Sequence, residues 1–175
     1  MSVIDPSDHR WLRWVIPAVV RHGASGWELK VLAVWADNSG NERPATQALT
    51  TYRGWLATGD VVVAGDFNHH RKWDHKNDNP LDHAHTVHGL ANRGLQSTYH
   101  ASRQTAERPD DRDEDAPTFW MYGHEDKPHH IDFVYAPVSW IRPDTVEIGS
   151  HHEFPGSARS DHAAVVARLA PTGHR

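Results

Sequence analysis

The chain has 175 residues, enough for one domain and too few for two of ordinary size, so we expect residues 1–175 to form a single domain. Its formal charge of −5 argues against a protein that coats nucleic acid with a basic face, yet leaves room for an enzyme that acts on phosphate esters. It has no cysteine, no apolar run long enough to cross a bilayer and no signal-peptide layout in MSVIDPSDHR, which favours a cytoplasmic protein without thiolate metal ligands.

The first part of the chain is predicted to form a hairpin, a helix and a buried strand. Residues 14–20 and 28–36 are rich in β-branched side chains, and the turn-forming sequence between them predicts an antiparallel pair. Residues 43–59 have apolar side chains at helical spacing, and Gly59 suits a C-terminal cap. These apolar side chains are Ala48, Leu49, Tyr52, Trp55 and Leu56. The following run, DVVVAGDFN (60–68), is continuous and apolar, which is typical of a strand buried on both faces.

The second part is predicted to be one helix followed mostly by strands. The helix spans 81–94, with Asp82 as its N-cap. The charged stretch 102–117 and the segment 151–160 are predicted loops. Runs of β-branched and aromatic residues predict short strands at 95–100, 118–123, 129–137, 144–150 and 162–170. This order of elements predicts a layered α/β protein with a large mixed or antiparallel sheet component.

Polar residues interrupt the apolar strands in three places. Asp66 and Asn68 lie two apart at the end of a buried strand, so their side chains share one face. Asp132 interrupts an apolar strand, and Asp161 and His162 stand directly before the last one. A carboxylate in such a place is costly unless it binds a metal, a cation or a hydrogen-bond partner. One occurrence is typical of a turn, whereas three together predict a functional site.

The three stretches VVVAGDFN, HHIDFVY and SDHAAVV resemble the C-terminal motifs of the endonuclease/exonuclease/phosphatase superfamily. This group includes DNase I, AP endonucleases, sphingomyelinases and inositol polyphosphate 5-phosphatases. The resemblance covers roughly residues 14–170, in the family's order and with compatible spacing. It implies a DNase I-like four-layer α/β sandwich, in which two packed mixed or antiparallel sheets are flanked by helices.

The resemblance also implies a chemistry, the metal-assisted attack of water on phosphorus with Mg²⁺ or Mn²⁺ as cofactor. Asp66 would align or deprotonate the water and lie at the metal, and Asn68 would hold Asp66 and the phosphate. Asp161 would bind the metal or its water shell. His162 would face the phosphate, with Asp132 bonded to its ring and favouring the imidazolium. The alternative is that Asp132 and His162 are only a buried, satisfied pair.

One departure from the family concerns the N-terminal part. The family carries a metal-binding glutamate in a Gln-Glu pair, and an asparagine motif before it, and neither precedes residues 28–36 here. We therefore expect a sandwich that is N-terminally incomplete: the gene is shorter, its start codon is placed too late, or another subunit supplies the rest. Loss of that carboxylate should weaken Mg²⁺ binding. The missing strands would leave a sheet edge exposed, which predicts a homo-oligomer formed through that edge.

A second departure concerns substrate contacts. At the end of the second predicted strand the family carries a histidine or tyrosine that contacts the phosphate, and this chain has Trp35 there. Asn38, three residues further on, resembles a phosphate-contacting asparagine of AP endonucleases. Trp35 is either a core residue or a wall of the site. The stretch HHRKWDHK (69–76) leaves the predicted site, so Arg71 and Lys72 are candidates for drawing in an anionic substrate. The alternative is a solvated loop without a role.

Three functions remain open at this point. The first is a metal-dependent phosphoesterase whose substrate is nucleic acid, phosphoinositide or a phospholipid head group. The second is a degenerate, weak or inactive family member that acts as a binding or scaffold protein, as the absent glutamate allows. The third is a zinc site on His83, His85 and His88, although histidines at helical spacing are more often surface residues.

Overall fold

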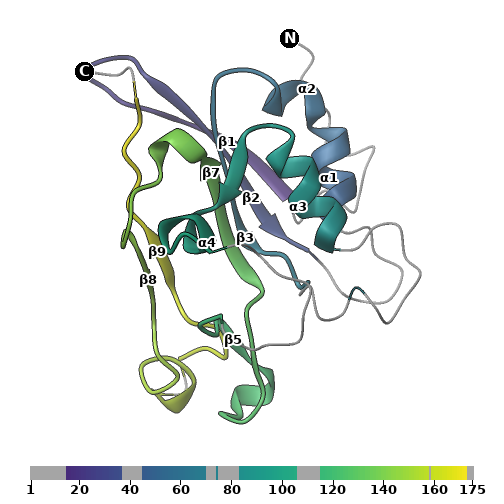
Figure 1. The fold of residues 1–175 in the computed structure, drawn as a ribbon, viewed down its shortest axis with the longest axis vertical. Coiled ribbons are helices and arrows are strands. Elements are labelled where there is room, and N and C mark those ends of the chain that lie inside the picture. Colours follow the sequence, from purple (N-terminus) through teal and green to yellow (C-terminus); the bar gives the residue numbers. More distant parts are fainter. Residues whose placement is uncertain are drawn as a thin grey trace.

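The computed structural model describes residues 15–36, 45–69, 74, 83–105, 115–157 and 159–172. A five-stranded sheet with the strand order β1-β2-β3-β7-β4 forms its centre (Figure 1). Its strands are β1 (Val15–Arg21), β2 (Glu28–Trp35), β3 (Asp60–Asp66), β7 (Asp132–Pro137) and β4 (Leu95–Ser97). The predicted hairpin is confirmed, because β1 and β2 pair antiparallel. β3 runs parallel to β2 and antiparallel to β7, so the sheet is mixed, as predicted.

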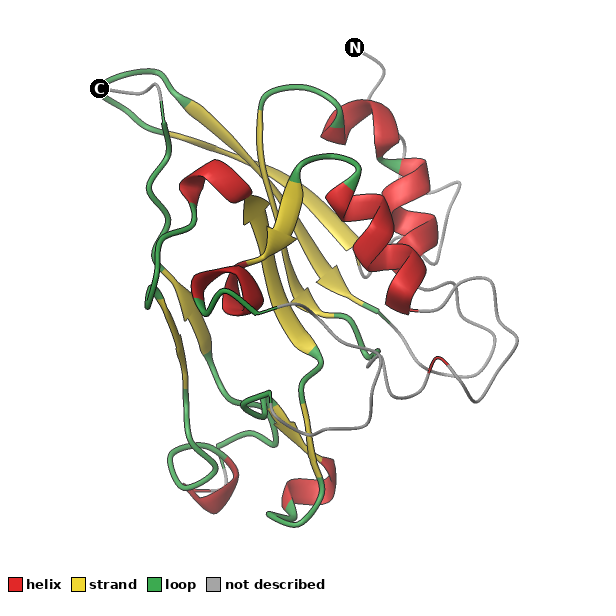
Figure 2. Ribbon diagram, in the orientation of Figure 1, coloured by secondary structure: helices red, strands yellow, loops and turns green. Residues whose placement is uncertain are grey.

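Two short antiparallel ribbons accompany this sheet (Figure 2). They pair β5 (Phe119–Trp120) with β6 (Pro128–His129), and β8 (Val146–Ile148) with β9 (Val165–Ala167). Four predicted strands are shorter than expected, since 95–100, 118–123, 144–150 and 162–170 are reduced to β4, β5, β8 and β9. The predicted strand 129–137 is divided into β6 and β7. Residues after β4 form α4 (Thr98–Ser102), and those after β5 form a tight turn at Met121–Gly123. The chain therefore leaves the sheet early at both points.

Three helices pack on one face of the sheet. They are α1 (Ala45–Thr51), α2 (Arg53–Leu56) and α3 (His83–Ala91), and a single predicted helix over 43–59 is in fact α1 and α2, separated at Tyr52. The core between helices and sheet takes alternate strand residues, because side chains two apart share a face. These include Leu32, Val34, Val61, Val63, Phe133 and Tyr135, packed against Ala48, Leu49, Leu56 and Leu90.

Asp74 caps the start of α3. Its two carboxylate oxygens accept the backbone N–H groups of His83 at 2.9 Å and Ala84 at 3.1 Å, which would otherwise lack a partner within the helix. The predicted cap, Asp82, lies outside the described residues. The cap that the structure shows therefore comes from a residue distant in sequence.

The other face of the sheet is covered only in part. Trp140 packs there against Val62 and Ala136, and Trp27 and Leu169 lie against this cluster. Over β1 and β2 the same face is open, with Ile16, Val20 and Trp35 between 50% and 59% exposed. Within the described residues β1 is an edge strand, and association through that edge stays a prediction. None of the described helices has the length and apolar character needed to cross a membrane.

Candidate active site

The neighbouring ends of β3 and β7 bring two carboxylates together. Asp66 ends β3, Asp132 begins β7, and the two are direct partners in the antiparallel register, so their side chains lie on the same face. The residue before Asp66 is Gly65, with φ of +141°, and a Cβ there would lie 1.9 Å from the carbonyl oxygen of Val34. Only glycine permits this close approach of β2 and β3 directly beneath Asp66.

Asn68 fixes the carboxylate of Asp66. Its backbone has φ of 48°, in the left-handed region that asparagine tolerates better than most residues. Its backbone N–H donates to Asp66 Oδ1 at 2.8 Å, and its Nδ2 donates to Asp66 Oδ2 at 3.0 Å. Nδ2 also donates to the carbonyl of Ala36 at 2.7 Å, just beyond β2. The hold of Asn68 on Asp66 is as the resemblance implies, whereas its contact with phosphate stays a prediction.

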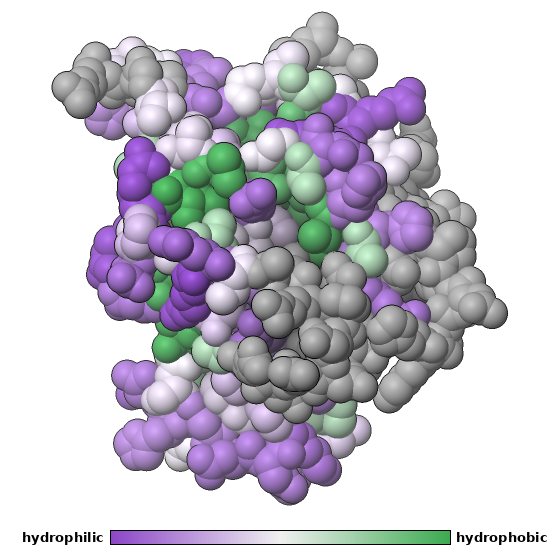
Figure 3. Space-filling model, in the orientation of Figure 1, coloured by the Kyte–Doolittle hydropathy of each residue, from purple (hydrophilic) through white to green (hydrophobic). Residues whose placement is uncertain are grey.

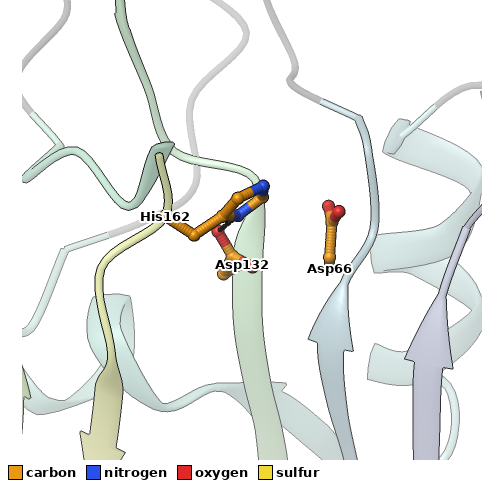
Figure 4. A group of neighbouring side chains, drawn as sticks. All are labelled: Asp66, Asp132 and His162. Atoms are coloured by element: carbon orange, nitrogen blue, oxygen red, sulfur yellow. Dashed lines mark hydrogen bonds and ion pairs between the residues drawn. The ribbon is translucent and has the colours of Figure 1, made fainter. Parts of the chain in front are cut away.

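His162 completes the group from the segment before β9 (Figure 4). Its Nδ1 lies 2.9 Å from Asp132 Oδ2 and donates to it when protonated, and its ring lies 4.6 Å from the ring of Phe119, measured between centroids. The ring is therefore held on two sides. Because Nδ1 is engaged by Asp132, Nε2 is the ring atom that remains to meet a substrate.

Thr118 sets the position of His162 relative to Asp132. Its buried hydroxyl oxygen accepts the backbone N–H groups of Ile131 and Asp132, both at 3.0 Å. Its carbonyl accepts the N–H of Ala163 at 2.7 Å, next to His162. Sequence reasoning missed Thr118, since its only signal is a polar residue at the start of an apolar run.

The electrostatics of the group favour proton exchange near neutral pH. Burial, and after it the negative charge of Asp132, raise the pKa of Asp66 to about 6, although the hydrogen bond from the N–H of Asn68 acts in the opposite direction. The hydrogen bond to Asp132 is the main cause that raises the pKa of His162, against the effect of its burial. Asp66 is therefore a carboxylate with raised basicity, beside an imidazole whose protonated form Asp132 favours.

The two carboxylates of this group suit a divalent cation, whereas a protonated His162 has no lone pair to offer one. Asp66, Asp132 and His162 each offer one ligand atom within 4.8 Å of the others, and within the described ranges no other group of this kind occurs. Carboxylate oxygens are the ligands that Mg²⁺ and Mn²⁺ prefer. A cation there would offset the repulsion from Asp132 that contributes to the raised pKa of Asp66, so the residues fit such an ion.

The other predicted site residues have different placements. Asp161 is exposed next to His162, and its charge contributes to the raised pKa of both Asp66 and His162. Trp35 is the partner of Asp66 in the parallel register of β2 and β3, and half of it is exposed, so it stands beside the site and outside the core. The remaining three lie outside the described residues: Asn38, Arg71 and Lys72.

The histidines of α3 do not converge on a metal. His83 is fully buried, with its ring 4.9 Å from that of Phe133, whereas His85 and His88 are exposed. The zinc site that their spacing suggested is absent from the groups formed by the described residues.

The fold can be compared with known proteins. No model of a known family and no curated protein matches the chain. Among solved structures, NExo from Neisseria, a 3′ phosphatase bound to a product DNA hairpin, matches with a TM-score of 0.55 and 18% identity. An endonuclease/exonuclease/phosphatase family protein from Leptotrichia buccalis matches with a TM-score of 0.53 and 14% identity. The endonuclease domain of TRAS1, a telomere-specific non-LTR retrotransposon, matches with a TM-score of 0.52 and 17% identity. The chain has the DNase I-like fold.

These likenesses support the fold predicted from the three motifs of the endonuclease/exonuclease/phosphatase superfamily. The matches cover 90% of this chain in each case, and 65%, 54% and 63% of the three neighbours in the order given. This DNase I-like chain thus spans little more than half to two thirds of the length of the proteins it matches. Two of these neighbours are a 3′ phosphatase and an endonuclease domain. In this chain Asp66 and Asp132 lie at adjacent strand ends of the same fold.

Proposed function

We propose that this protein is a divalent-metal-dependent hydrolase of phosphate esters. The observation that carries the proposal is the group formed by Asp66, Asp132 and His162, with Asn68 bonded to Asp66, at adjacent strand ends of a DNase I-like fold. Burial and hydrogen bonding prepare each of these side chains for a separate role. A buried, satisfied pair of Asp132 and His162 would not require a second carboxylate beside it.

Asp66 acts as the base that accepts a proton from the attacking water. In the metal-free protein its pKa of about 6 leaves it ionised at neutral pH and still close enough to that pH to take up a proton. Asn68 holds both oxygens of this carboxylate, so that the orientation of the base does not have to be established during the reaction.

His162 acts as a donor to a non-bridging oxygen of the phosphate. Asp132 accepts a hydrogen bond from Nδ1 and raises the pKa of the ring, which favours the protonated form in which the Nε2–H meets the substrate. A bound Mg²⁺ or Mn²⁺, held by Asp66 and by Asp161 as the resemblance implies, would offset negative charge on the phosphate. Arg71 and Lys72 are proposed to attract the anionic substrate.

The test is turnover of bis-p-nitrophenyl phosphate by protein stripped with EDTA and then given Mg²⁺ or Mn²⁺. Asp66→Asn and His162→Ala should each lower turnover by about a hundredfold or more, since each removes a proton-transfer or charge-stabilising group. Asp144→Asn, which changes an exposed carboxylate in the same way, is the matched control and should leave turnover unchanged. Circular dichroism should show that all three variants are folded.

Two outcomes would contradict the proposal. Near-wild-type turnover in Asp66→Asn or His162→Ala would separate these residues from the reaction. Full turnover in excess EDTA would remove the metal from it. A folded wild-type protein that binds Mg²⁺ or Mn²⁺ and turns over no phosphate ester would instead indicate the degenerate family member, which acts by binding.

A further inference from the structure

A strained aromatic residue stands in the turn next to the candidate site. Tyr122, within the turn Met121–Gly123, has φ of 58° and ψ of 23° and is 80% exposed. The left-handed region is unfavourable for a bulky L-residue, and an exposed ring gains little from burial to offset this. Backbone strain of this kind is concentrated at sites that bind or react. The ring of Tyr122 is therefore exposed at a conformational cost.

Hydrogen bonds tie this turn to the segment that carries His162. The backbone N–H of Trp120 donates to the carbonyl of Asp161 at 2.9 Å, and Phe119 pairs with His162 in an isolated β-bridge. On the other side of the turn, His151 Nε2 lies 3.0 Å from the carbonyl of Gly123. The turn therefore has a fixed position relative to the ring of His162.

A hollow of about 240 Å³ lies between the turn and the segment before His162. It is lined by Tyr122, Gly123, Pro155, Arg159, Ser160 and Asp161. The hollow is smaller than the roughly 300–1,000 Å³ pockets that enclose drug-sized ligands, so it suits a single ring system. Asp161, adjacent to His162 in the chain, belongs both to this hollow and to the surroundings of the candidate site.

The charges around the hollow suit a planar group that carries a phosphate. Lys127 Nζ lies 5.8 Å from the centroid of the Tyr122 ring, and the exposed guanidinium of Arg159 lines the hollow. An exposed aromatic ring with two cations in its surroundings fits a base that stacks, with a neighbouring phosphate that pairs. The lower end of the face shown in Figure 3, where these loops lie in Figure 1, is largely hydrophilic.

We infer that Tyr122 stacks on an unpaired base of a nucleic-acid strand, while Arg159 and Lys127 hold the phosphate beside that base. Nucleic acid is then the substrate class of the phosphoesterase, and this inference rests on the proposed function. A phosphoinositide or phospholipid head group has no aromatic ring for Tyr122 to stack on. Stacking of one base on an aromatic side chain corresponds to a change in affinity of about 5- to 150-fold.

The experiment compares two substrates that differ only in their bases. One is a short single-stranded oligodeoxynucleotide, and the other is an oligomer of the same length with abasic residues throughout. Tyr122→Asn should raise KM for the first by about 5-fold or more and leave KM for the second unchanged. Asparagine suits the left-handed backbone, so this variant keeps the turn and removes only the ring. Tyr122→Phe retains the ring and should restore the wild-type KM.

The role of the two cations is read from salt dependence. Arg159→Gln should raise KM for both oligomers and flatten the dependence of KM on salt, because a phosphate contact is lost in each. Glu147→Gln, a neutralising change at an exposed position of β8, is the control and should leave the salt dependence unchanged. An unchanged salt dependence in Arg159→Gln would overturn this part of the inference.

The result that would overturn the stacking role is an equal effect of Tyr122→Asn on both oligomers, or no effect on either. Faster turnover of a phosphoinositide or phospholipid head group than of the oligonucleotide would overturn the substrate class. Hydrolysis of bis-p-nitrophenyl phosphate keeps the two proposals separate. If that hydrolysis persists without any preference for bases, the subsite fails and the phosphoesterase stands. If it is absent but fluorescence anisotropy shows oligonucleotide binding that depends on Tyr122, the phosphoesterase fails and the subsite stands.

Discussion

Replacement of Asp66 by asparagine should stabilise the metal-free protein at neutral pH, although it removes the proposed base. Burial and the charge of Asp132 raise the pKa of Asp66 from 3.8 to about 6, so folding favours the protonated form. The free energy of unfolding therefore falls as the pH rises between these two values. At about 1.4 kcal/mol for each pH unit, the wild type loses about 3 kcal/mol by neutral pH. Asparagine carries no charge and avoids this loss.

The hydrogen bonds of Asp66 oppose part of that gain. Both of its oxygens accept hydrogen bonds from Asn68, and an amide at this position offers only one oxygen. The lost hydrogen bond costs about 1 kcal/mol, so the net gain of Asp66→Asn near neutral pH is about 2 kcal/mol. The hydrogen-bond cost is the same at every pH, whereas the charge penalty is not.

Urea unfolding in EDTA at about pH 4.5 and about pH 7.5 separates the two contributions. Between these values the difference in unfolding free energy should move in favour of Asp66→Asn by about 2 kcal/mol, because about 1.5 pH units of the titration of Asp66 in the folded protein lie above pH 4.5. Asp144→Asn is the control: Asp144 is exposed, and asparagine also suits its left-handed φ of 54°. A stability difference between wild type and Asp66→Asn that stays constant with pH would refute the assignment of a raised pKa to Asp66.

Three further predictions follow from the same geometry. Asp132→Asn should lower the pKa of His162, so that the loss of activity with rising pH begins at a lower pH, and an unchanged imidazole titration by NMR would contradict this. Mg²⁺ at about a hundred times its Kd should stabilise the wild type by about 3 kcal/mol and Asp66→Asn much less, as measured by thermal unfolding; equal shifts would place the ion elsewhere. Gly65→Ala should destabilise the fold by about 3 kcal/mol, because the new Cβ would overlap the carbonyl of Val34. If urea unfolding shows wild-type stability, β2 and β3 can move apart at this point without cost.

The polar members of the site were predictable because each breaks an apolar run. Asp66 and Asp132 each place a carboxylate in or at the end of an otherwise apolar strand. A carboxylate there has few structural explanations, because its burial is costly. Their direct pairing across β3 and β7 is a property of the sheet register, which single-strand periodicity does not contain. The order of the predicted elements gave the sheet type correctly, because the hairpin and the continuous apolar strand are both visible in the local sequence.

Other features depend on contacts that local sequence does not express. The break between α1 and α2 at Tyr52 interrupts an apolar spacing that continues through both helices. Asp74 caps α3 from a distant position, and Thr118 acts through its hydroxyl on a strand that follows it in the chain. The left-handed backbone of Tyr122 contradicts the preference of its residue type, so propensity predicts a strand there.

The backbone of Asn68 limits which residues can occupy position 68 in related proteins. Its left-handed φ restricts position 68 to asparagine, aspartate and glycine with little strain. Glycine would preserve the turn but offer no side-chain donor to Asp66, and aspartate would place an additional negative charge against it. If Asp66 is the base that we propose, asparagine at this position is expected in relatives of this fold that carry out the reaction. Glycine there, with Asp66 retained, is then expected in relatives that keep the fold without the reaction.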